Sequence, residues 1–236
     1  MSTHPPTAAP PEVIYPDSDG RPMSDNTLQF RWIVTIQGGL DVLFRDDPDV
    51  FVAGDLLWYP IEGDNRTRMA PDAMVAFGRP KGDRGSYLQW REGGIAPQVA
   101  FEVLSPQNTR REMDRKRAWY FRFGVEEYYE FDPDRTRLRG WVRDGEAIRE
   151  ILPMAGWVSP RLGVRFELDD DLTIIGPDGR PLATYVEISR QRDDAERGVE
   201  RERERAERER ERADRERDRA ERLAARLREL GLEPEE

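Results

Sequence analysis

The first regular pattern of apolar and polar residues is helical. Over residues 27–44 apolar side chains recur near a 3.6-residue spacing, and residues 24–26 just before them are all N-cap residue types. Gly38 and Gly39 interrupt the middle of this pattern, and glycine weakens a helix. The pattern predicts one helix, with the glycine pair as the place where it would kink.

Short apolar runs separated by turn residues come next. The runs at 50–60, 71–80 and 98–106 are apolar on both faces in places, which is typical of strands that are covered on two sides. Between the second and third runs lies a loop at 79–96 that is rich in Gly, Arg and Lys. Loops of this length in a compact domain are usually functional or mobile, so the loop is a candidate for contact with a substrate.

A second helix and several strands are predicted further along. The segment that starts near Asn108 continues as a helix to Gly124, and Thr109 and Glu112 have the spacing of a capping box. Three β segments follow this helix: a strand at 125–134, a hairpin at 137–152 with its turn at Asp144-Gly145, and further short β segments within 156–188.

The composition changes abruptly at about Gln191, where the chain becomes almost pure Arg, Glu and Asp with some Ala. One interpretation is a single solvated helix held by Glu–Arg pairs four residues apart, each worth about 0.2–0.5 kcal/mol. The other is a thin coiled coil that makes a homodimer, because small or apolar residues recur every seven residues. These residues are Val199, Ala206, Ala213, Ala220 and Leu227, with Leu223 and Leu230 at a second seam. Most second-seam positions are charged, which favours the single helix in isolation.

Three regions are therefore expected. Residues 1–22 form a Pro-rich disordered leader, residues 23–190 form one folded domain, and residues 191–236 form the Arg/Glu-rich helix.

Composition and charge limit the kinds of catalytic and metal-binding sites that the chain can form. The chain has no Cys, and its single His is His4 in the leader, which argues against disulfides, thiolate zinc sites, His-ligated metals and a Ser-His-Asp triad. A net charge of −10 does not suit bulk electrostatic binding of nucleic acid, but it is compatible with a local basic groove and a divalent cation. Carboxylates, Lys, Arg, Tyr and hard metal ions are left to carry chemistry.

The same sequence gives an expectation for location. No stretch approaches 18 apolar residues, so we expect no membrane span, and the first residues lack the basic and apolar regions of a secretory signal. We therefore expect a cytoplasmic protein.

Two carboxylates stand out within the apolar strands. Asp72 follows Pro71 at the start of one run, and Glu102 lies in the middle of another, where glutamate is a poor strand former and costly to bury. Two carboxylates on neighbouring strands can bind Mg²⁺, which takes few protein oxygens together with water and phosphate. The alternatives are an Asx turn for Asp72 and a buried ion pair with an Arg for Glu102.

A lysine and a further aspartate are candidates to join these two carboxylates. Lys81 and Lys116 are the only lysines in an Arg-rich chain, and a lysine near the carboxylates would orient water or stabilise a phosphate. The alternative for Lys116 is an exposed ion pair with Glu112. Asp55 is either a further ligand or a bulge residue after Gly54.

Several sequence blocks occur in the same order as in one known protein family. PDAMVAF, FEVLSPQNT and EMDRKRAWYFRFGVEEYYEFDPD, with matching blocks upstream, resemble the Uma-two family of restriction-endonuclease-like proteins in the PD-(D/E)XK nuclease superfamily, over roughly residues 15–150. The resemblance implies an α/β fold with a central mixed sheet flanked by helices, and hydrolysis of DNA phosphodiesters with Mg²⁺ or Mn²⁺. Asp72 and Glu102 match the metal-binding acids. Leu104 stands where the superfamily motif has Lys, and Lys116 on the next helix matches the place that supplies it in this family.

Two functions follow as hypotheses. The first is a metal-dependent DNA endonuclease with Asp72, Glu102 and Lys116 at its centre and with Glu112 and Asp55 as accessory groups. The loop residues Arg79, Lys81 and Arg84 are its candidate substrate contacts. The second is a non-catalytic scaffold that oligomerises or recruits partners through the C-terminal helix.

Overall fold

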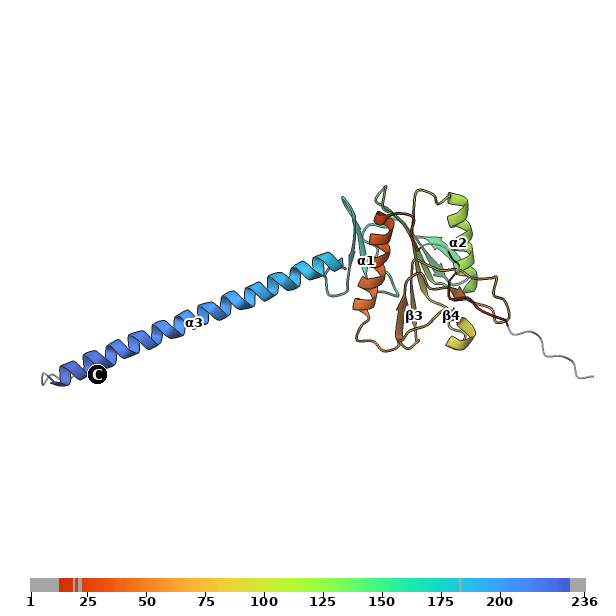
Figure 1. The fold of residues 1–236 in the computed structure, drawn as a ribbon. Helices are drawn as coiled ribbons and strands as arrows, with labels where there is room; N and C mark the ends of the chain where they lie inside the picture. Colours follow the sequence, from red (N-terminus) through yellow and green to blue (C-terminus); the bar gives the residue numbers. More distant parts are fainter. Residues whose placement is uncertain (1–12, 19, 21–22, 183, 230–236) are drawn as a thin grey trace, which may run out of the picture. The chain divides into compact units, whose positions relative to one another are not determined.

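The computed structural model describes residues 13–18, 20, 23–182 and 184–229. Its elements are α1 (Thr27–Leu43), β1 (Val50–Ala53), β2 (Trp58–Tyr59), β3 (Ala73–Phe77), β4 (Tyr87–Leu88), the 3-10 helix η1 (Gln89–Glu92), β5 (Val99–Val103), α2 (Arg110–Phe123), β6 (Glu127–Asp132), β7 (Arg137–Asp144), β8 (Ala147–Glu150), β9 (Arg165–Leu168), β10 (Leu172–Ile175) and α3 (Tyr185–Glu229). The α/β class with a central mixed sheet and flanking helices is confirmed, as Figure 1 shows.

The central sheet has six strands in the order β1-β3-β5-β6-β7-β8. Strands β5 and β6 pair in parallel and the other neighbours pair antiparallel. A parallel pair needs a crossover connection, and α2 supplies it between β5 and β6. This β5-α2-β6 unit lays α2 across the sheet beside the two strands that it joins.

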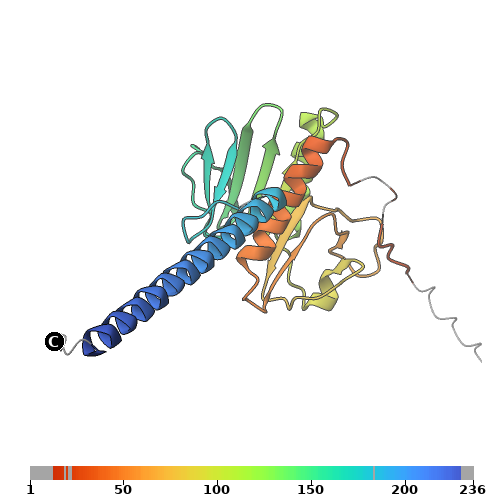
Figure 2. The same cartoon turned by 60° about the vertical axis from the view of Figure 1, so that its left-hand side comes forward.

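Two apolar cores form because successive strand residues point to opposite faces of the sheet. On one face, Phe101 and Tyr129 pack with Ile33 and Ile36 of α1, and the hairpin of β9 and β10 (cyan in Figure 2) closes this core through Phe166. On the other face, strand residues such as Ala100 pack beneath α2. Glu102, two residues after Ala100, points to this α2 face.

The two helices of the domain begin at the predicted residues. Asn26 caps α1 by accepting a hydrogen bond from the backbone N–H of Gln29 at 2.8 Å. Thr109 caps α2 by accepting from the backbone N–H of Glu112 at 3.2 Å, which is half of the predicted capping box. Gly124 ends α2 in the left-handed region at φ 118°, where glycine is the most tolerant residue.

The structure corrects three predictions of local structure. The strand predicted at 50–60 divides into β1 and β2, which lie in different sheets, because Asp55 adopts a left-handed φ of 48° between them. The loop at 79–96 holds β4 and η1. The β segments predicted within 156–188 end earlier, since the last helix begins at Tyr185.

Most of the predicted leader lies outside the described residues, including His4. The part that is described contacts the domain. Tyr59 Oη donates to the Pro16 carbonyl at 2.7 Å, and the Tyr15 ring packs at 5.2 Å from the Tyr59 ring. Residues 15–16 are therefore held by the β2 region.

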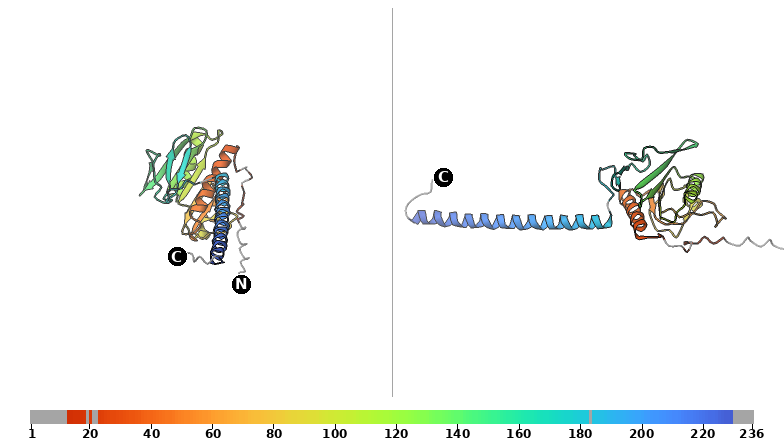
Figure 3. Two further views of the ribbon diagram at one scale, coloured as in Figure 1. Left: turned by 90° about the vertical axis from the view of Figure 1, so that its left-hand side faces the viewer. Right: turned by 90° about the horizontal axis from the view of Figure 1, so that it is seen from above.

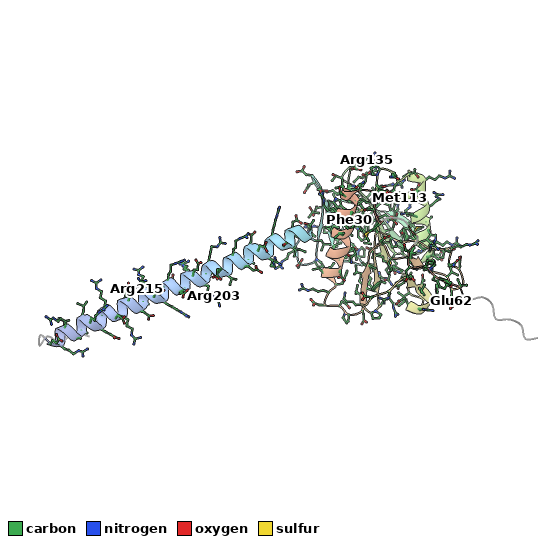
Figure 4. The ribbon with its side chains drawn as sticks, viewed as in Figure 1. Phe30, Glu62, Met113, Arg135, Arg203 and Arg215 are labelled. Carbon is green, nitrogen blue, oxygen red and sulfur yellow. The ribbon has the colours of Figure 1, made fainter. Side chains whose placement is uncertain are left out.

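The C-terminal helix α3 is a separate unit that begins after Thr184. It runs without a break from Tyr185 to Glu229 (Figure 3). Its residues Arg203 and Arg215, labelled in Figure 4, point away from the helix axis. Glu and Arg residues four apart pair along it, for example Arg205 with Glu209 at 3.2 Å. Within the described residues, no helix is both long enough and apolar enough to cross a bilayer.

The glycine pair of α1 provides a matched test of the packing. A Cβ added at Gly39 would lie 2.8 Å from the Cβ of Leu182, whereas one added at Gly38 would meet no described atom within 4 Å. We expect Gly39→Ala to lower the free energy of unfolding by about 1–3 kcal/mol through overpacking. We expect Gly38→Ala to raise it by about 0.5–1 kcal/mol through better helix propensity. Urea unfolding of both variants checks this, and equal effects would contradict the packing described.

Candidate active site

A row of charged side chains crosses the α2 face of the sheet. Glu102 of β5 is the register partner of Glu130 on β6, and Glu130 is the register partner of Arg139 on β7. Asp72 lies just before β3 on the other side of β5, where its Oδ2 accepts the backbone N–H of Val103 at 2.6 Å. The strand register therefore brings Asp72 next to Glu102, although 30 residues of chain separate them.

Glu102 is held from above by two side chains of α2. Lys116 Nζ donates to Oε2 of Glu102 at 2.7 Å, and the Tyr120 hydroxyl donates to Oε1 at 2.5 Å. Lys116 and Tyr120 are four residues apart, so they lie on the same side of the helix. With only 3% of its side chain exposed, Glu102 depends on these two donors to keep a buried carboxylate hydrogen-bonded.

Burial and neighbouring charges shift the pKa values of this group. Burial, followed by the nearby Glu102 carboxylate, raises the pKa of Asp72 well above its usual range. For Lys116, burial favours the neutral amine, but the Glu102 and Asp72 carboxylates outweigh it and raise the pKa above the usual value. Lys116 is therefore a cation held against two carboxylates that repel each other.

Gln29 of α1 braces the strand that carries Glu102. Its side-chain Nε2 donates to the Val103 carbonyl at 2.7 Å, and its Oε1 accepts from the Asp25 backbone N–H at 2.8 Å. Asp25 Oδ2 in turn accepts from the Ser105 hydroxyl at 2.5 Å. These bonds fix the end of β5 and its following turn, and thus the position of Glu102.

These groups surround a cavity of about 810 Å³. Asp72, Glu102 and Lys116 line it together, so the structure brings the three predicted residues to one place. Asp55 and Glu112, the predicted accessory residues, also line this cavity. Two alternative interpretations can be compared with the structure. Glu102 is hydrogen-bonded to a lysine and a tyrosine, not paired with an arginine. Lys116 bonds to Glu102, whereas the alternative paired it with Glu112.

The predicted substrate contacts lie elsewhere. Arg79 and Arg84 both bind the carboxylate of Glu92, at 3.0 Å and 2.7 Å, and Arg84 also stacks on the Phe51 ring. Lys81 Nζ donates to the Val50 carbonyl at 3.2 Å. None of these three is among the described residues that line the cavity.

Two arginines that sequence reasoning missed line the cavity instead. Arg66 and Arg68 line the cavity from the loop between β2 and β3. Asp64 builds this loop, since its Oδ1 accepts the backbone N–H groups of Arg66 and Thr67 at 2.8 Å and 3.1 Å. The D-x-R-T-R pattern at 64–68 gives no signal by itself, because nothing in it shows that the loop folds back over the carboxylates.

Gln29 and Tyr120 were also missed, although each carries a signal. Gln29 occupies the same helical stripe as Ile33, Ile36 and Leu40, and a glutamine on an apolar stripe needs a buried partner. Tyr120 follows Lys116 by one helical turn. Both signals identify a buried polar group but not its partner.

The donor set fits a hard divalent cation. Mg²⁺ is commonly bound by one or two carboxylates with water and phosphate completing its coordination. Asp72 and Glu102 provide two carboxylates whose mutual repulsion a cation would relieve, and each oxygen has acceptor capacity beyond the single hydrogen bond described above. Across the described residues, no three Asp, Glu, His or Cys side chains gather into a site, so the protein would supply the smaller share of the ligands.

Comparisons with known proteins identify chains that are similar to this one. The model of the family Uma2, described as "Putative restriction endonuclease", matches residues 27–174, which is more than half of the chain. A crystal structure from Anabaena variabilis ATCC 29413, described as a putative nuclease belonging to DUF820, is similar at 16% sequence identity and a TM-score of 0.45, covering 58% of this chain and 75% of that one. No curated protein gives a significant match.

The brace by Gln29 can be tested through stability. Gln29→Leu leaves the Val103 carbonyl without its buried donor, so we expect the free energy of unfolding to fall by about 1–3 kcal/mol. Gln37→Leu on the same helix is the control, with an expected change within about 0.5 kcal/mol. Urea titrations measure the free energy of unfolding of both variants. Equal losses of stability would show that the hydrogen bond from Gln29 to Val103 does not stabilise the fold.

Proposed function

The chain belongs to the Uma2 family, and from this membership we propose that it is a metal-dependent endonuclease that hydrolyses phosphodiester bonds in DNA. One observation supports the proposal most: Asp72 just before β3, Glu102 of β5 and Lys116 of α2 line one cavity. A fold does not need this convergence, because replacing a buried ion pair by apolar residues is often neutral or stabilising.

Asp72 and Glu102 would hold Mg²⁺ or Mn²⁺. Such a cation lowers the pKa of water and offsets the charge that develops on a phosphate. The part of the protein is to aim both carboxyl groups at one point. The Val103 N–H group orients Asp72, and the Tyr120 hydroxyl orients Glu102.

Lys116 would act on the attacking water or on a phosphate oxygen. Its ammonium group is held at 2.7 Å from Glu102 and lines the cavity, so it stands beside the carboxylates rather than in bulk solvent. A positioned cation is worth most where charge develops in a site with little water. This role matches the place where the family resemblance puts the lysine.

Arg66 and Arg68 would bind the phosphates of the substrate. They line the cavity together with the carboxylates, and arginine forms bidentate hydrogen bonds with phosphate. They replace Arg79, Lys81 and Arg84 as candidate substrate contacts, because those three do not line the cavity of the carboxylates.

A second candidate function rests on α3. Its apolar residues are exposed, with Val199 at 65% and Leu223 at 56% relative exposure, and they follow the seven-residue pattern of a coiled-coil seam. This favours a scaffold in which α3 pairs with a second copy. The Arg–Glu pairs within the helix instead support a single helix, since they satisfy its charges locally.

The catalytic proposal predicts that Glu102→Gln abolishes DNA cleavage in Mg²⁺ or Mn²⁺, with a rate loss of at least about a hundredfold. Glu127→Gln is the matched control, because Glu127 is a strand glutamate with 1% exposure that bonds to Ser159 on the opposite face of the sheet. Cleavage of a supercoiled plasmid is measured at a temperature where thermal melts show both variants folded. Equal activity of the two variants would refute the role of Glu102.

The scaffold candidate predicts a change of mass in solution. Replacing Val199 and Leu223 by Glu in the full chain would remove apolar seam residues, so a dimer seen by light scattering would become a monomer. Replacing exposed Arg203 and Arg215 by Lys is the control and would leave the mass unchanged. A monomeric wild-type chain would reject this candidate and support the single helix.

A further inference from the structure

A second polar cavity lies at the start of α2. It has a volume of about 400 Å³ and lies between the first turn of α2 and the β6–β7 hairpin. Four arginines line it, namely Arg110, Arg135, Arg137 and Arg139, against two carboxylates. The lining is therefore net positive, although the whole chain has a net charge of −10.

The hairpin explains why these arginines gather. Arg137 and Arg139 are two residues apart on β7 and therefore point to the same face as Glu130 and Trp141. Arg135 lies in the turn, where its backbone N–H and guanidinium bind Asp132 at 3.2 Å and 2.8 Å. The Arg139 guanidinium lies 4.6 Å from the centre of the Trp141 ring, which keeps it extended over the sheet.

The arginines are tethered without being enclosed. Arg135 is 75% exposed and Arg110 is 47% exposed, so each presents donors to solvent beyond those used by its acidic partner. Arg110 binds Glu130 at 3.0 Å and Asp114 at 2.9 Å, and Arg139, whose side chain is 21% exposed, binds Glu150 at 2.7 Å. Each guanidinium has five N–H donors, so these pairs leave several donors on each arginine for a ligand. Figure 4 labels Arg135 at the surface of the domain.

This cavity adjoins the first one. Asn108, the residue before the N-cap of α2, lines both cavities, and its side chain donates to Glu112 at 3.4 Å on the carboxylate side. The first turn of α2 therefore stands between a carboxylate-lined cavity and an arginine-lined one. A long polyanion bound in the first cavity would pass over this turn to the second.

We infer that the cavity of Arg110, Arg135, Arg137 and Arg139 binds the phosphate backbone of duplex DNA at a point away from the bond that is cut. This inference rests on the proposed nuclease function for its choice of polyanion. Arginine suits phosphate because its planar donors match two phosphate oxygens. None of the described residues that line this cavity is aromatic, and proteins that bind single strands use aromatic rings to stack bases. The lining therefore favours backbone contact with a duplex.

Binding of a fluorescent DNA duplex in EDTA tests this inference without cleavage, using full-length protein over a range of salt concentrations. We expect the Arg135→Ala/Arg137→Ala variant to bind about tenfold more weakly than wild type. Its plot of log affinity against log salt should be shallower by about 1.8, because each phosphate contact contributes roughly 0.9 to the slope. The matched control is Arg31→Ala/Arg91→Ala, which removes two exposed arginines outside both cavities and should keep the wild-type slope.

The possible results separate this inference from the proposed function. If the Arg135/Arg137 variant and the control bind alike, or if a single strand of equal length binds more tightly than the duplex, the inference is overturned even when the wild type cleaves DNA. If duplex binding depends on Arg135 and Arg137 but no cleavage occurs in Mg²⁺ or Mn²⁺, the proposed activity fails and the inference stands. Bis(4-nitrophenyl) phosphate, a diester too small to reach both cavities, should be hydrolysed equally by wild type and the Arg135/Arg137 variant.

Discussion

The arrangement of the site depends on the buried carboxylate of Glu102. A glutamate inside an apolar strand needs hydrogen-bond donors, and α2 supplies them through Lys116 and Tyr120 at 2.7 Å and 2.5 Å. Satisfying this carboxylate fixes the rotation of α2 about its own axis, so that one side carries Lys116 and the other faces Glu130. The hydrogen bonds to Glu102 thereby place the amine of Lys116 beside the two carboxylates. They also position α2 between the two cavities.

The mixed sheet provides the rest of the geometry. The antiparallel β3–β5 pair brings Asp72 to Glu102, and the parallel β5–β6 pair places Glu130 on the other side of Glu102. The two acids meet different partners because they lie beneath different sides of the same helix. Glu102 has an amine and a phenol within a cavity, whereas Glu130 binds Arg110 beside an arginine-lined surface. One strand register thus supports a candidate reaction centre and a candidate backbone-binding surface.

Much of the fold is predictable from the sequence because the strong local signals agree with the tertiary structure. The caps at Asn26 and Thr109 and the apolar periodicity of α1 define the domain helices correctly. Predictions from local sequence patterns are wrong where contacts between distant parts of the chain determine the structure. Asp55 turns the chain between β1 and β2 although the run reads as one strand, and Arg79 and Arg84 of the predicted contact loop both bind Glu92 away from the cavity. Arg66 and Arg68 reach the cavity through the folding of a loop, which composition does not reveal.

The central claim is that Asp72 and Glu102 hold one divalent cation beside Lys116. Anomalous diffraction from crystals grown with Mn²⁺ tests this claim most directly, because it locates the ion and its ligands together. The account predicts an anomalous peak between these two carboxylates, with oxygen distances of about 2.0–2.3 Å, and the Lys116 ammonium group lining the same cavity. A cation bound elsewhere, or no bound cation at saturating Mn²⁺, would contradict it.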